Sequence, residues 1–236
     1  MLKLNLDASE AEWSSELYHQ LSSSPDPSFR VPSPILASNN HYVFQSWTAF
    51  QYVPNLCSPE CKWERILHAS RAFHTALKDI HCPDFLARRC HIWAIADRVA
   101  WGEDEVLIHP ALQPVFRQLQ SLRKKVQLPS QLVHGDLTGN TFFTEEGETM
   151  ILDFSPFWRP VEFAEAVVLV DAVLDHREEE GVFKLMQGVE RGQMLVRALL
   201  FRVVAWSGYV GLEGRVEEGY IAAFDKATLL VQLAMT

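Results

Sequence analysis

The sequence predicts an α+β protein in which a front part with strands precedes a longer, mainly helical part. Up to about residue 55, short apolar runs are separated by turn residues, a pattern typical of strands. From Glu60 onward, apolar residues recur three and four positions apart, as they do along one face of an amphipathic helix. Between residues 129 and 154 the pattern returns to short β-like runs, so one compact β unit interrupts the helical part.

The front part is expected to contain one helix and one hairpin. A helix is predicted over residues 8–21, because Asp7 is a good N-cap and apolar residues recur at fourfold spacing. These apolar residues are Trp13, Leu17 and Leu21. Residues 22–34 hold four prolines and are predicted to form a loop. Residues 35–37 and 41–53 then read as a hairpin whose second strand is long.

The longer part is predicted to hold amphipathic helices and three short strands. An apolar stripe from Ile66 to Ile80 marks the first helix. Further helices are expected over residues 85–101, 111–126, 161–176, 181–209 (in one or two pieces) and 215–233. The strands are expected at residues 131–133, 141–143 and 150–152, with a turn at 145–148 before the last.

The composition is that of an ordinary globular protein with an acidic balance. Of the 236 residues, 48% are apolar, which excludes wholesale disorder. The chain has 21 Lys and Arg against 30 Asp and Glu, a net charge of −9, and this argues against a nucleic-acid-binding protein. No uncharged apolar run approaches the roughly 20 residues of a membrane span, and the N-terminus has no apolar signal segment. We therefore expect a cytoplasmic protein that binds neither nucleic acid nor membrane.

The compact β unit carries the residues on which a functional interpretation depends. Its first apolar strand leads into His134-Gly135-Asp136-Leu137-Thr138-Gly139-Asn140, and its last apolar strand ends at Asp153. Phosphoryl transfer from a nucleotide needs a carboxylate that orients the attacking hydroxyl, and oxygen ligands that hold Mg²⁺ at the phosphates. Asp and Asn oxygens suit this hard cation better than Cys or His. The pattern therefore favours magnesium-dependent transfer of a phosphoryl group.

The same residues resemble the catalytic loop and metal-binding strand of the aminoglycoside phosphotransferase and choline-kinase-like families, relatives of the protein kinases. The resemblance rests on His134-Gly135-Asp136-Leu137, on Asn140 and on Asp153-Phe154. It implies that Asp136 is the catalytic base, that Asn140 and Asp153 are the Mg²⁺ ligands, and that His134 braces the loop. The thirteen-residue step from Asn140 to Asp153 matches the family, whereas the four-residue step from Asp136 to Asn140 is one shorter than usual.

The resemblance reaches the start of the chain and implies nucleotide-binding residues there. In these families a lysine on the third strand holds the α- and β-phosphates, and a helix glutamate pairs with it. Lys3 stands in the corresponding place, and Glu12 or Glu16 is the expected partner. Main-chain groups near Gln51 to Val53 are expected to meet the adenine of ATP.

The implied architecture is an α+β, protein-kinase-like two-lobed fold with an incomplete N-terminal β lobe and a mainly helical C-terminal lobe. Residues 1–55 are expected to form the partial nucleotide-covering lobe, without the first two strands and the phosphate-covering loop. Residues 56–236 are expected to form the helical lobe, with the catalytic loop at 132–143 and the metal strand at 150–154. The chain looks like an N-terminally truncated member of an uncharacterised actinobacterial and fungal subgroup.

Three interpretations of the function follow. The first is an ATP- and Mg²⁺-dependent phosphotransferase that moves the γ-phosphate to a small-molecule hydroxyl. The second is a catalytically inactive, kinase-like binding protein. The third is an incomplete gene model whose upstream residues carry the missing loop. The sequence leaves the acceptor open among aminoglycosides, choline-like amines, sugars, amino acids and nucleosides, and leaves any protein partner unnamed.

Arginines in the helical part are expected to need carboxylate partners. Arg197 and Arg202 lie in an apolar predicted helix, and a buried arginine is stable only when it is paired. Asp171 or Glu165 is a plausible partner for either of them. For Arg159, which follows the last strand, an anionic substrate group and a structural ion pair are both open.

Overall fold

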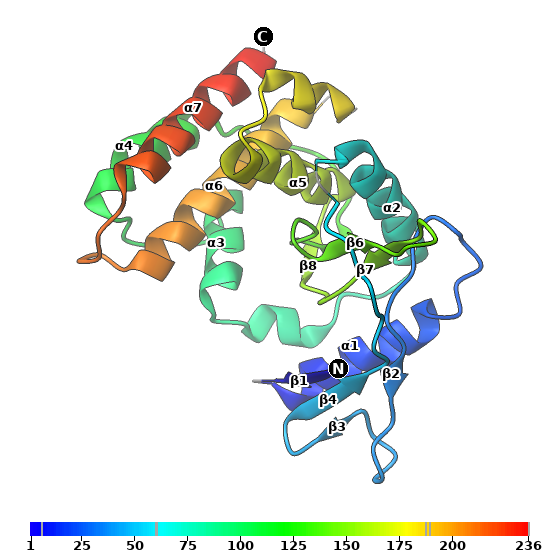
Figure 1. The fold of residues 1–236 in the computed structure, drawn as a ribbon. Coiled ribbons are helices and arrows are strands. Elements are labelled where there is room, and N and C mark those ends of the chain that lie inside the picture. Colours follow the sequence, from blue (N-terminus) through cyan, green and yellow to red (C-terminus); the bar gives the residue numbers. More distant parts are fainter. Residues whose placement is uncertain (6, 60, 187, 189, 236) are drawn as a thin grey trace. The chain divides into compact units, whose positions relative to one another are not determined.

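The computed structural model describes residues 1–5, 7–59, 61–186, 188 and 190–235. It has the mixed α+β composition that the sequence predicts, and its contacts divide into two compact units (Figure 1). The first unit combines Met1–Phe85 with Gln131–Phe157, and the second combines Leu86–Ser130 with Trp158–Thr236. These bounds differ from the predicted lobes 1–55 and 56–236, because the chain up to Phe85 and the compact β unit pack with the front residues.

The first unit contains a small antiparallel sheet in which β4 (Trp47–Phe50) pairs with the other three strands. These are β1 (Leu2–Leu4), β2 (Pro34–Ile35) and β3 (Val43–Phe44). The register places Lys3 of β1 opposite Thr48 of β4.

The long second hairpin strand predicted for residues 41–53 is wrong. Gln45 and Ser46 have positive φ values of 47° and 67°, and the turn that they form separates β3 from β4. The two short strands then pair with each other, with Phe44 opposite Trp47.

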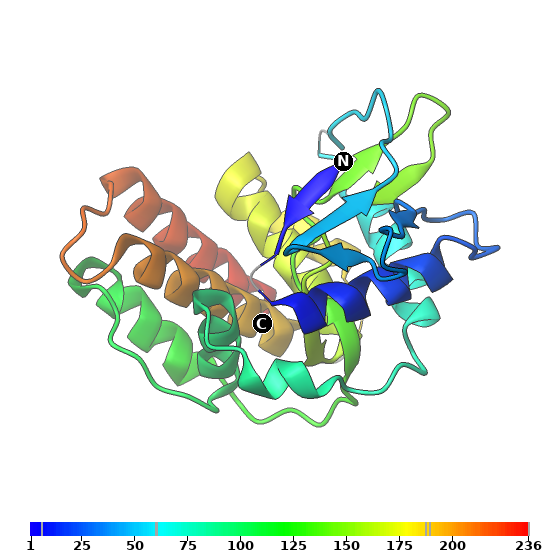
Figure 2. The same cartoon turned by 90° about the horizontal axis from the view of Figure 1, so that it is seen from below.

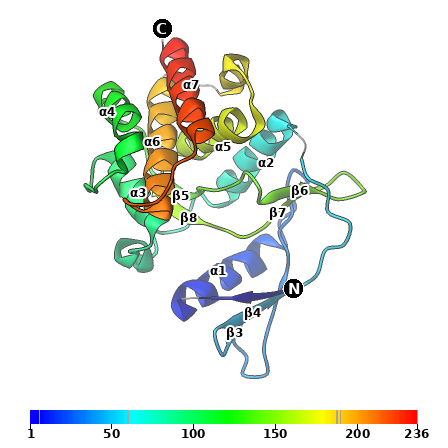
Figure 3. The same ribbon diagram turned by 60° about the vertical axis from the view of Figure 1, so that its left-hand side comes forward.

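Helix α1 (Ala8–Leu21) has the range that the sequence predicts, and it lies along the small sheet (Figures 2 and 3). The Asp7 side chain caps it by accepting hydrogen bonds from the backbone N–H groups of Ser9 and Glu10, at 2.8 and 3.0 Å. Leu17 and Leu21 are buried, as their spacing predicts.

The rest of the first unit consists of α2 (Trp63–Ala76) and short strands. Glu60, where the helical pattern starts, lies outside the described residues. The three predicted strands are confirmed as β5 (Gln131–His134), β6 (Thr141–Phe143) and β7 (Thr149–Ile151). β5 pairs with β8 (Pro156–Arg159), a strand that the sequence analysis did not predict. The buried face of α2 contacts β5 and β7 through a core that includes Ile66, Leu67 and Phe73.

The second unit is built around α6 (Arg191–Val210), which α3 (Ile92–Trp101), α4 (Gln113–Leu122), α5 (Val161–His176) and α7 (Glu218–Ala234) all contact (Figure 1). Apolar side chains cover α5 and α6 on nearly all sides and are buried, as expected for helices at the centre of a core. The short 3₁₀ helices η2 (Pro110–Leu112) and η3 (Glu180–Leu185) complete this unit, and a third, η1 (Asp84–Arg88), spans the boundary between the two units in the sequence.

Two predicted helical regions of the longer part are each divided into a 3₁₀ helix and an α-helix, the second in the two pieces that its prediction allowed. The single helix predicted over residues 85–101 is wrong: η1 ends at Arg88, and α3 starts after His91, whose Nδ1 accepts a hydrogen bond from the Ala94 N–H at 3.3 Å. The region predicted at 181–209 separates into η3 and α6, with residues 187 and 189 outside the described part. The prediction for 161–176 is confirmed by α5.

The predicted partners of the helical arginines are confirmed for one and wrong for the other. Arg202 donates to Asp171, from Nε to Oδ1 at 2.6 Å and from Nη2 to Oδ2 at 2.5 Å. Arg197 instead donates to neutral oxygens of Gln193 and Lys124. The oxygens around it therefore accept from its two terminal nitrogens without matching its charge.

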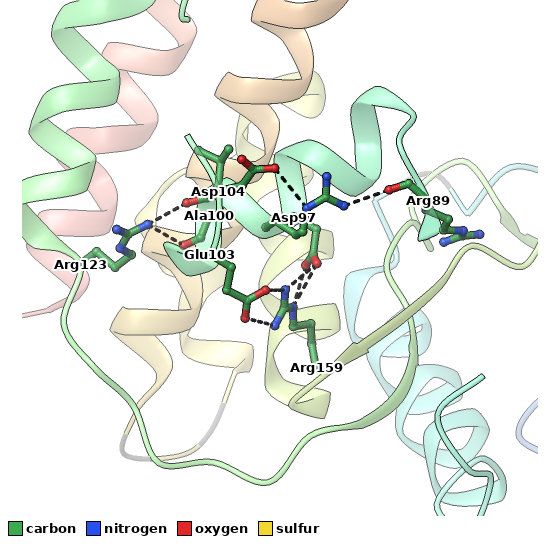
Figure 4. A network of polar contacts seen from close by, with 9 residues as sticks. Arg89, Asp97, Ala100, Glu103, Asp104, Arg123 and Arg159 are labelled. Atoms are coloured by element: carbon green, nitrogen blue, oxygen red, sulfur yellow. Dashed lines mark hydrogen bonds and ion pairs between the residues drawn. The ribbon is translucent and has the colours of Figure 1, made fainter. Parts of the chain in front are cut away.

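Arg159 is the centre of an ion-pair network in the second unit (Figure 4). Its guanidinium donates to both oxygens of Asp97 and to both oxygens of Glu103, with closest distances of 2.7 Å. Burial opposes its charge, but the bonds to Glu103 and Asp97 raise the pKa of Arg159. Of the two roles open for this residue, the structure shows the ion pair.

None of the helices within the described residues combines the length and the apolar character that crossing a membrane requires.

Candidate active site

The β6–β7 hairpin brings the two ends of the predicted motif together. Thr141 pairs with Ile151, so that the residues just outside the hairpin, Asn140 and Leu152, lie side by side. The Leu152 N–H donates to the Asn140 carbonyl oxygen at 2.7 Å. The thirteen-residue step from Asn140 to Asp153 is thus the length of one short hairpin and its turn.

The Asn140 side chain folds back onto Asp136. Its Nδ2 donates to the Asp136 carbonyl oxygen at 2.7 Å and to Asp136 Oδ2 at 3.3 Å. Gly139, between them, has a φ of +80°, a conformation that glycine adopts at little cost. The four-residue step from Asp136 to Asn140 is therefore closed by a turn at Gly139.

The His134 imidazole connects the loop after β5 with the chain after β7. His134 Nδ1 accepts a hydrogen bond from the Asp136 N–H at 3.1 Å, and His134 Nε2 donates to the Leu152 carbonyl oxygen at 3.2 Å. Burial lowers the pKa of His134 to about 4, so the ring is neutral at pH 7 and has one donor and one acceptor nitrogen. The bonded N–H belongs to Asp136 itself, and the bonded carbonyl belongs to the residue directly before Asp153.

His74 of α2 supports His134 from beneath. His74 Nε2 accepts a hydrogen bond from the His134 N–H at 2.9 Å, and the other ring nitrogen lies 3.1 Å from Ser70 Oγ. Burial lowers the pKa of His74 to about 3. Gln131 Nε2 donates to the His74 carbonyl oxygen at 2.7 Å, which fixes the start of β5 on the same helix. The motif spacing did not point to Ser70 or Gln131, because they contact the loop only through α2.

Phe154 and Gly135 fix the loop by packing. The Phe154 ring lies edge-on to the rings of His134 and Phe73, with centroids 5.4 and 5.7 Å apart. Gly135 has no room for a side chain, since a Cβ atom there would lie 2.3 Å from the Phe157 ring. Phe157 lies on β8, the strand that pairs with β5, so its ring leaves room only for a glycine at position 135.

Asp153 has an uncommon backbone conformation and a charged partner from the start of the chain. Its φ is +43°, in the left-handed region that non-glycine residues seldom occupy, and such outliers are found preferentially at functional sites. Lys3 Nζ donates to Asp153 Oδ1, and both side chains are about half exposed. Lys3 and Asp153 are 150 positions apart in the sequence, so the fold itself brings the predicted phosphate-binding and metal-binding residues together.

The remaining predicted residues do not join this pair. Glu12 accepts hydrogen bonds from the backbone N–H groups of Tyr42 and Val43, at 2.9 and 2.8 Å, so the structure pairs Lys3 with Asp153 instead of Glu12. Glu16 is exposed. Past the end of β4, Gln51 donates its N–H to the Ser33 carbonyl oxygen at 2.8 Å.

The donor atoms of the site suit a hard divalent cation. Asp136 and Asp153 offer carboxylate oxygens, and Asn140 directs its Nδ2 to Asp136 and so keeps its Oδ1 for other partners. The described residues contain no group of three or more His, Cys, Asp or Glu side chains arranged for a metal. Mg²⁺ is commonly held by one or two carboxylates together with substrate phosphates, so this sparse donor set fits it.

Comparisons with known proteins find likenesses among solved structures. No protein-family model and no curated protein matches the chain. The chain is similar to choline kinase LicA from Streptococcus pneumoniae, with 11% identity and a TM-score of 0.48, over 98% of this chain and 85% of that one. A structure of LicA in complex with AMP gives 10% identity and a TM-score of 0.45, over 98% and 83%. Because both scores are below 0.5, the case for a function comes from the chain's own residues.

Proposed function

We propose that this protein is a kinase-like phosphotransferase that moves the γ-phosphate of ATP to a hydroxyl group of a small molecule. The observation that carries the proposal is the pair of hydrogen bonds made by one neutral imidazole: the His134 ring accepts from the Asp136 N–H and donates to the Leu152 carbonyl oxygen. This arrangement holds a carboxylate on a loop at a fixed distance from a second carboxylate on a strand end. Phosphoryl transfer depends on such positioning more than on covalent chemistry by the protein.

In the proposed reaction each residue has one task. Asp136 orients the acceptor hydroxyl and takes its proton as the oxygen attacks the γ-phosphorus, while the bond from that phosphorus to the β–γ bridging oxygen breaks and ADP leaves. Asn140 and Asp153 would hold Mg²⁺, which supplies charge neutralisation at the phosphates when bound. Lys3 would exchange its bond to Asp153 for the α- and β-phosphates. Val53 and the neighbouring main chain would meet the adenine, since the Gln51 N–H is already bonded to Ser33.

A second candidate is a binding protein of the same fold without catalysis. It is favoured by the Lys3–Asp153 contact, because this pair neutralises the two charges that the reaction would use. Transfer of the phosphoryl group distinguishes the two candidates, since an active enzyme must displace Lys3 from Asp153 when Mg²⁺-ATP binds and then complete the reaction.

The first test measures turnover of Mg²⁺-ATP by the wild-type protein and by Asp136→Asn, with a set of hydroxyl-bearing metabolites as acceptors. Loss of a catalytic base lowers the rate by about 10²–10⁴-fold. Asp175→Asn, which removes a charge from an exposed position of α5, is the matched control and should keep full activity. Equal turnover by Asp136→Asn and the wild type would exclude Asp136 from the mechanism.

Calorimetric titration with Mg²⁺-ATP tests the metal-binding strand separately. We expect binding by the wild type and by Asp136→Asn, and its loss in Asp153→Ala. Binding that survives in Asp153→Ala would contradict the metal role of this residue. Wild-type binding without any transfer to an acceptor or to water would favour the non-catalytic candidate.

A further inference from the structure

The second unit contains a pocket lined by cations, and none of the described residues that line it carries a carboxylate. Its volume is about 280 Å³, and it is formed by the end of α3, the chain after α4, and α6. The lining residues are Trp101, Arg123, Lys124, Lys125, Val126 and Arg197. Four of these six side chains are positively charged, so the pocket is a region of positive potential in a protein whose net charge is −9.

Arg197 is the buried member of this set, with 3% of its surface exposed. Its Nη1 donates to the Gln193 carbonyl oxygen at 3.1 Å and to Gln193 Oε1 at 3.0 Å, and its Nη2 donates to the Lys124 carbonyl oxygen at 2.6 Å. Its Nε is buried and has no acceptor in the described part of the chain. A buried guanidinium with only neutral acceptors is costly, and an anion in the pocket would remove that cost.

Two of the carboxylates near the pocket are engaged elsewhere. Asp97 and Glu103 both bind Arg159, as Figure 4 shows. Burial and the Arg123 cation lower the pKa of Arg197 to about 10, and Glu190 counteracts this only through its field. Arg197 therefore stays charged at neutral pH without a carboxylate hydrogen-bonded to it.

The pocket walls are held in place before any ligand binds. Arg123 Nη1 donates to the carbonyl oxygens of Val99 and Ala100, at 2.7 and 3.3 Å, at the C-terminal end of α3, where a cation is favoured (Figure 4). Gly102, with a φ of +77°, leaves room for this guanidinium, since a Cβ atom there would lie 2.7 Å from Arg123 Nη2. The Lys124 N–H donates to Gln193 Oε1 at 2.6 Å, which anchors the lysine-bearing chain on α6.

Trp101 provides a second buried donor. The Arg159 and Arg197 guanidinium groups lie over its ring, 4.8 and 4.7 Å from the centroid. Its Nε1 is buried and, like the Arg197 Nε, lacks an acceptor among the described residues. Two donors without acceptors thus belong to side chains that line the same cationic pocket.

We propose that this pocket binds the phosphate group of a small phosphomonoester. A phosphate dianion offers several oxygen acceptors to the arginine and lysine side chains that line the pocket, and it balances their positive charges. The volume holds a phosphate with a small organic group attached, and Val126 supplies an apolar surface for that group. This inference does not depend on the proposed phosphotransfer, because every lining residue belongs to the second unit.

The test titrates inorganic phosphate into the full chain at constant ionic strength, by calorimetry and by the shift in Tm. The double variant Lys124→Gln/Lys125→Gln removes two exposed charges of the pocket and leaves the buried Arg197 intact. Hydrogen bonds to charged groups are strong enough that we expect binding to weaken by at least about tenfold. The matched control is Lys184→Gln/Lys226→Gln, two exposed lysines of the same unit, which should bind phosphate as the wild type does.

Lys3→Met separates this site from the candidate active site. Phosphate binding that persists in Lys3→Met and weakens in the Lys124/Lys125 variant supports the pocket. Three results would overturn the proposal: no phosphate binding by the wild type, equal weakening in the Lys184/Lys226 control, or loss of binding in Lys3→Met alone.

Discussion

Gly135 shows how a single missing side chain positions the candidate site. A Cβ atom at this position would lie 2.3 and 2.6 Å from two atoms of the Phe157 ring. Gly135→Ala therefore forces the loop that carries Asp136 away from β8, and overpacking of this kind costs about 1–3 kcal/mol. We expect a lower free energy of unfolding in urea titrations, together with a loss of ATP turnover larger than the loss of stability explains.

The control for this prediction is Gly181→Ala, since a Cβ atom there meets nothing within 4 Å. Adding Phe157→Leu to Gly135→Ala should restore part of the stability, because the smaller side chain makes room for the new methyl group. A Gly135→Ala protein as stable as the Gly181→Ala protein would show that the contact with Phe157 relaxes without cost.

The connection between α1 and β3 depends on Glu12. Although burial opposes its charge, the N–H groups of Tyr42 and Val43 lower the pKa of the Glu12 carboxyl. We expect Glu12→Ala to lower the free energy of unfolding by about 1.5–3 kcal/mol, the usual contribution of hydrogen bonds to a charged group. Glu16→Ala, one turn further along the same helix, should change it little. Equal effects of the two substitutions in urea titrations would exclude this role of Glu12.

The sequence was most informative where the pattern is local. The range of α1 follows from the Asp7 cap and the apolar spacing, and the β6–β7 hairpin follows from two short apolar runs around a turn. The turn between β3 and β4 was missed because both of its residues, Gln45 and Ser46, have positive φ, a conformation that glycine, asparagine and aspartate signal and these residues do not. Spacing could not supply the partner of Lys3, because that contact joins residues 150 positions apart.

The two units carry different chemistry. The residues proposed for phosphoryl transfer lie within Met1–Phe85 and Gln131–Phe157, and the cationic pocket lies within Leu86–Ser130 and Trp158–Thr236. The predicted boundary near residue 55 follows a change in the spacing of apolar residues, whereas the two units are defined by contacts between residues. Helix α2, for example, packs on β5 and β7 although it precedes them by more than fifty positions. Helical periodicity along a chain therefore does not tell which strands a helix will cover.

Two neutral histidines at the centre of the first unit make the stability of the whole protein depend on pH. Burial lowers the pKa of His134 to about 4 and of His74 to about 3, whereas in the unfolded chain both return to about 6.5. Below pH 6.5 the unfolded state binds more protons than the folded state, so stability falls as the pH falls. The slope is at most about 1.4 kcal/mol per pH unit for each histidine.

Urea titrations between pH 7 and 5 should show this loss of stability before most carboxylates titrate. In His74→Gln the amide oxygen can still accept the His134 N–H, and the slope should be roughly halved. His81→Gln, at an exposed position, should leave the slope unchanged. A pH dependence that is the same in all three proteins would show that the buried imidazoles do not control acid unfolding.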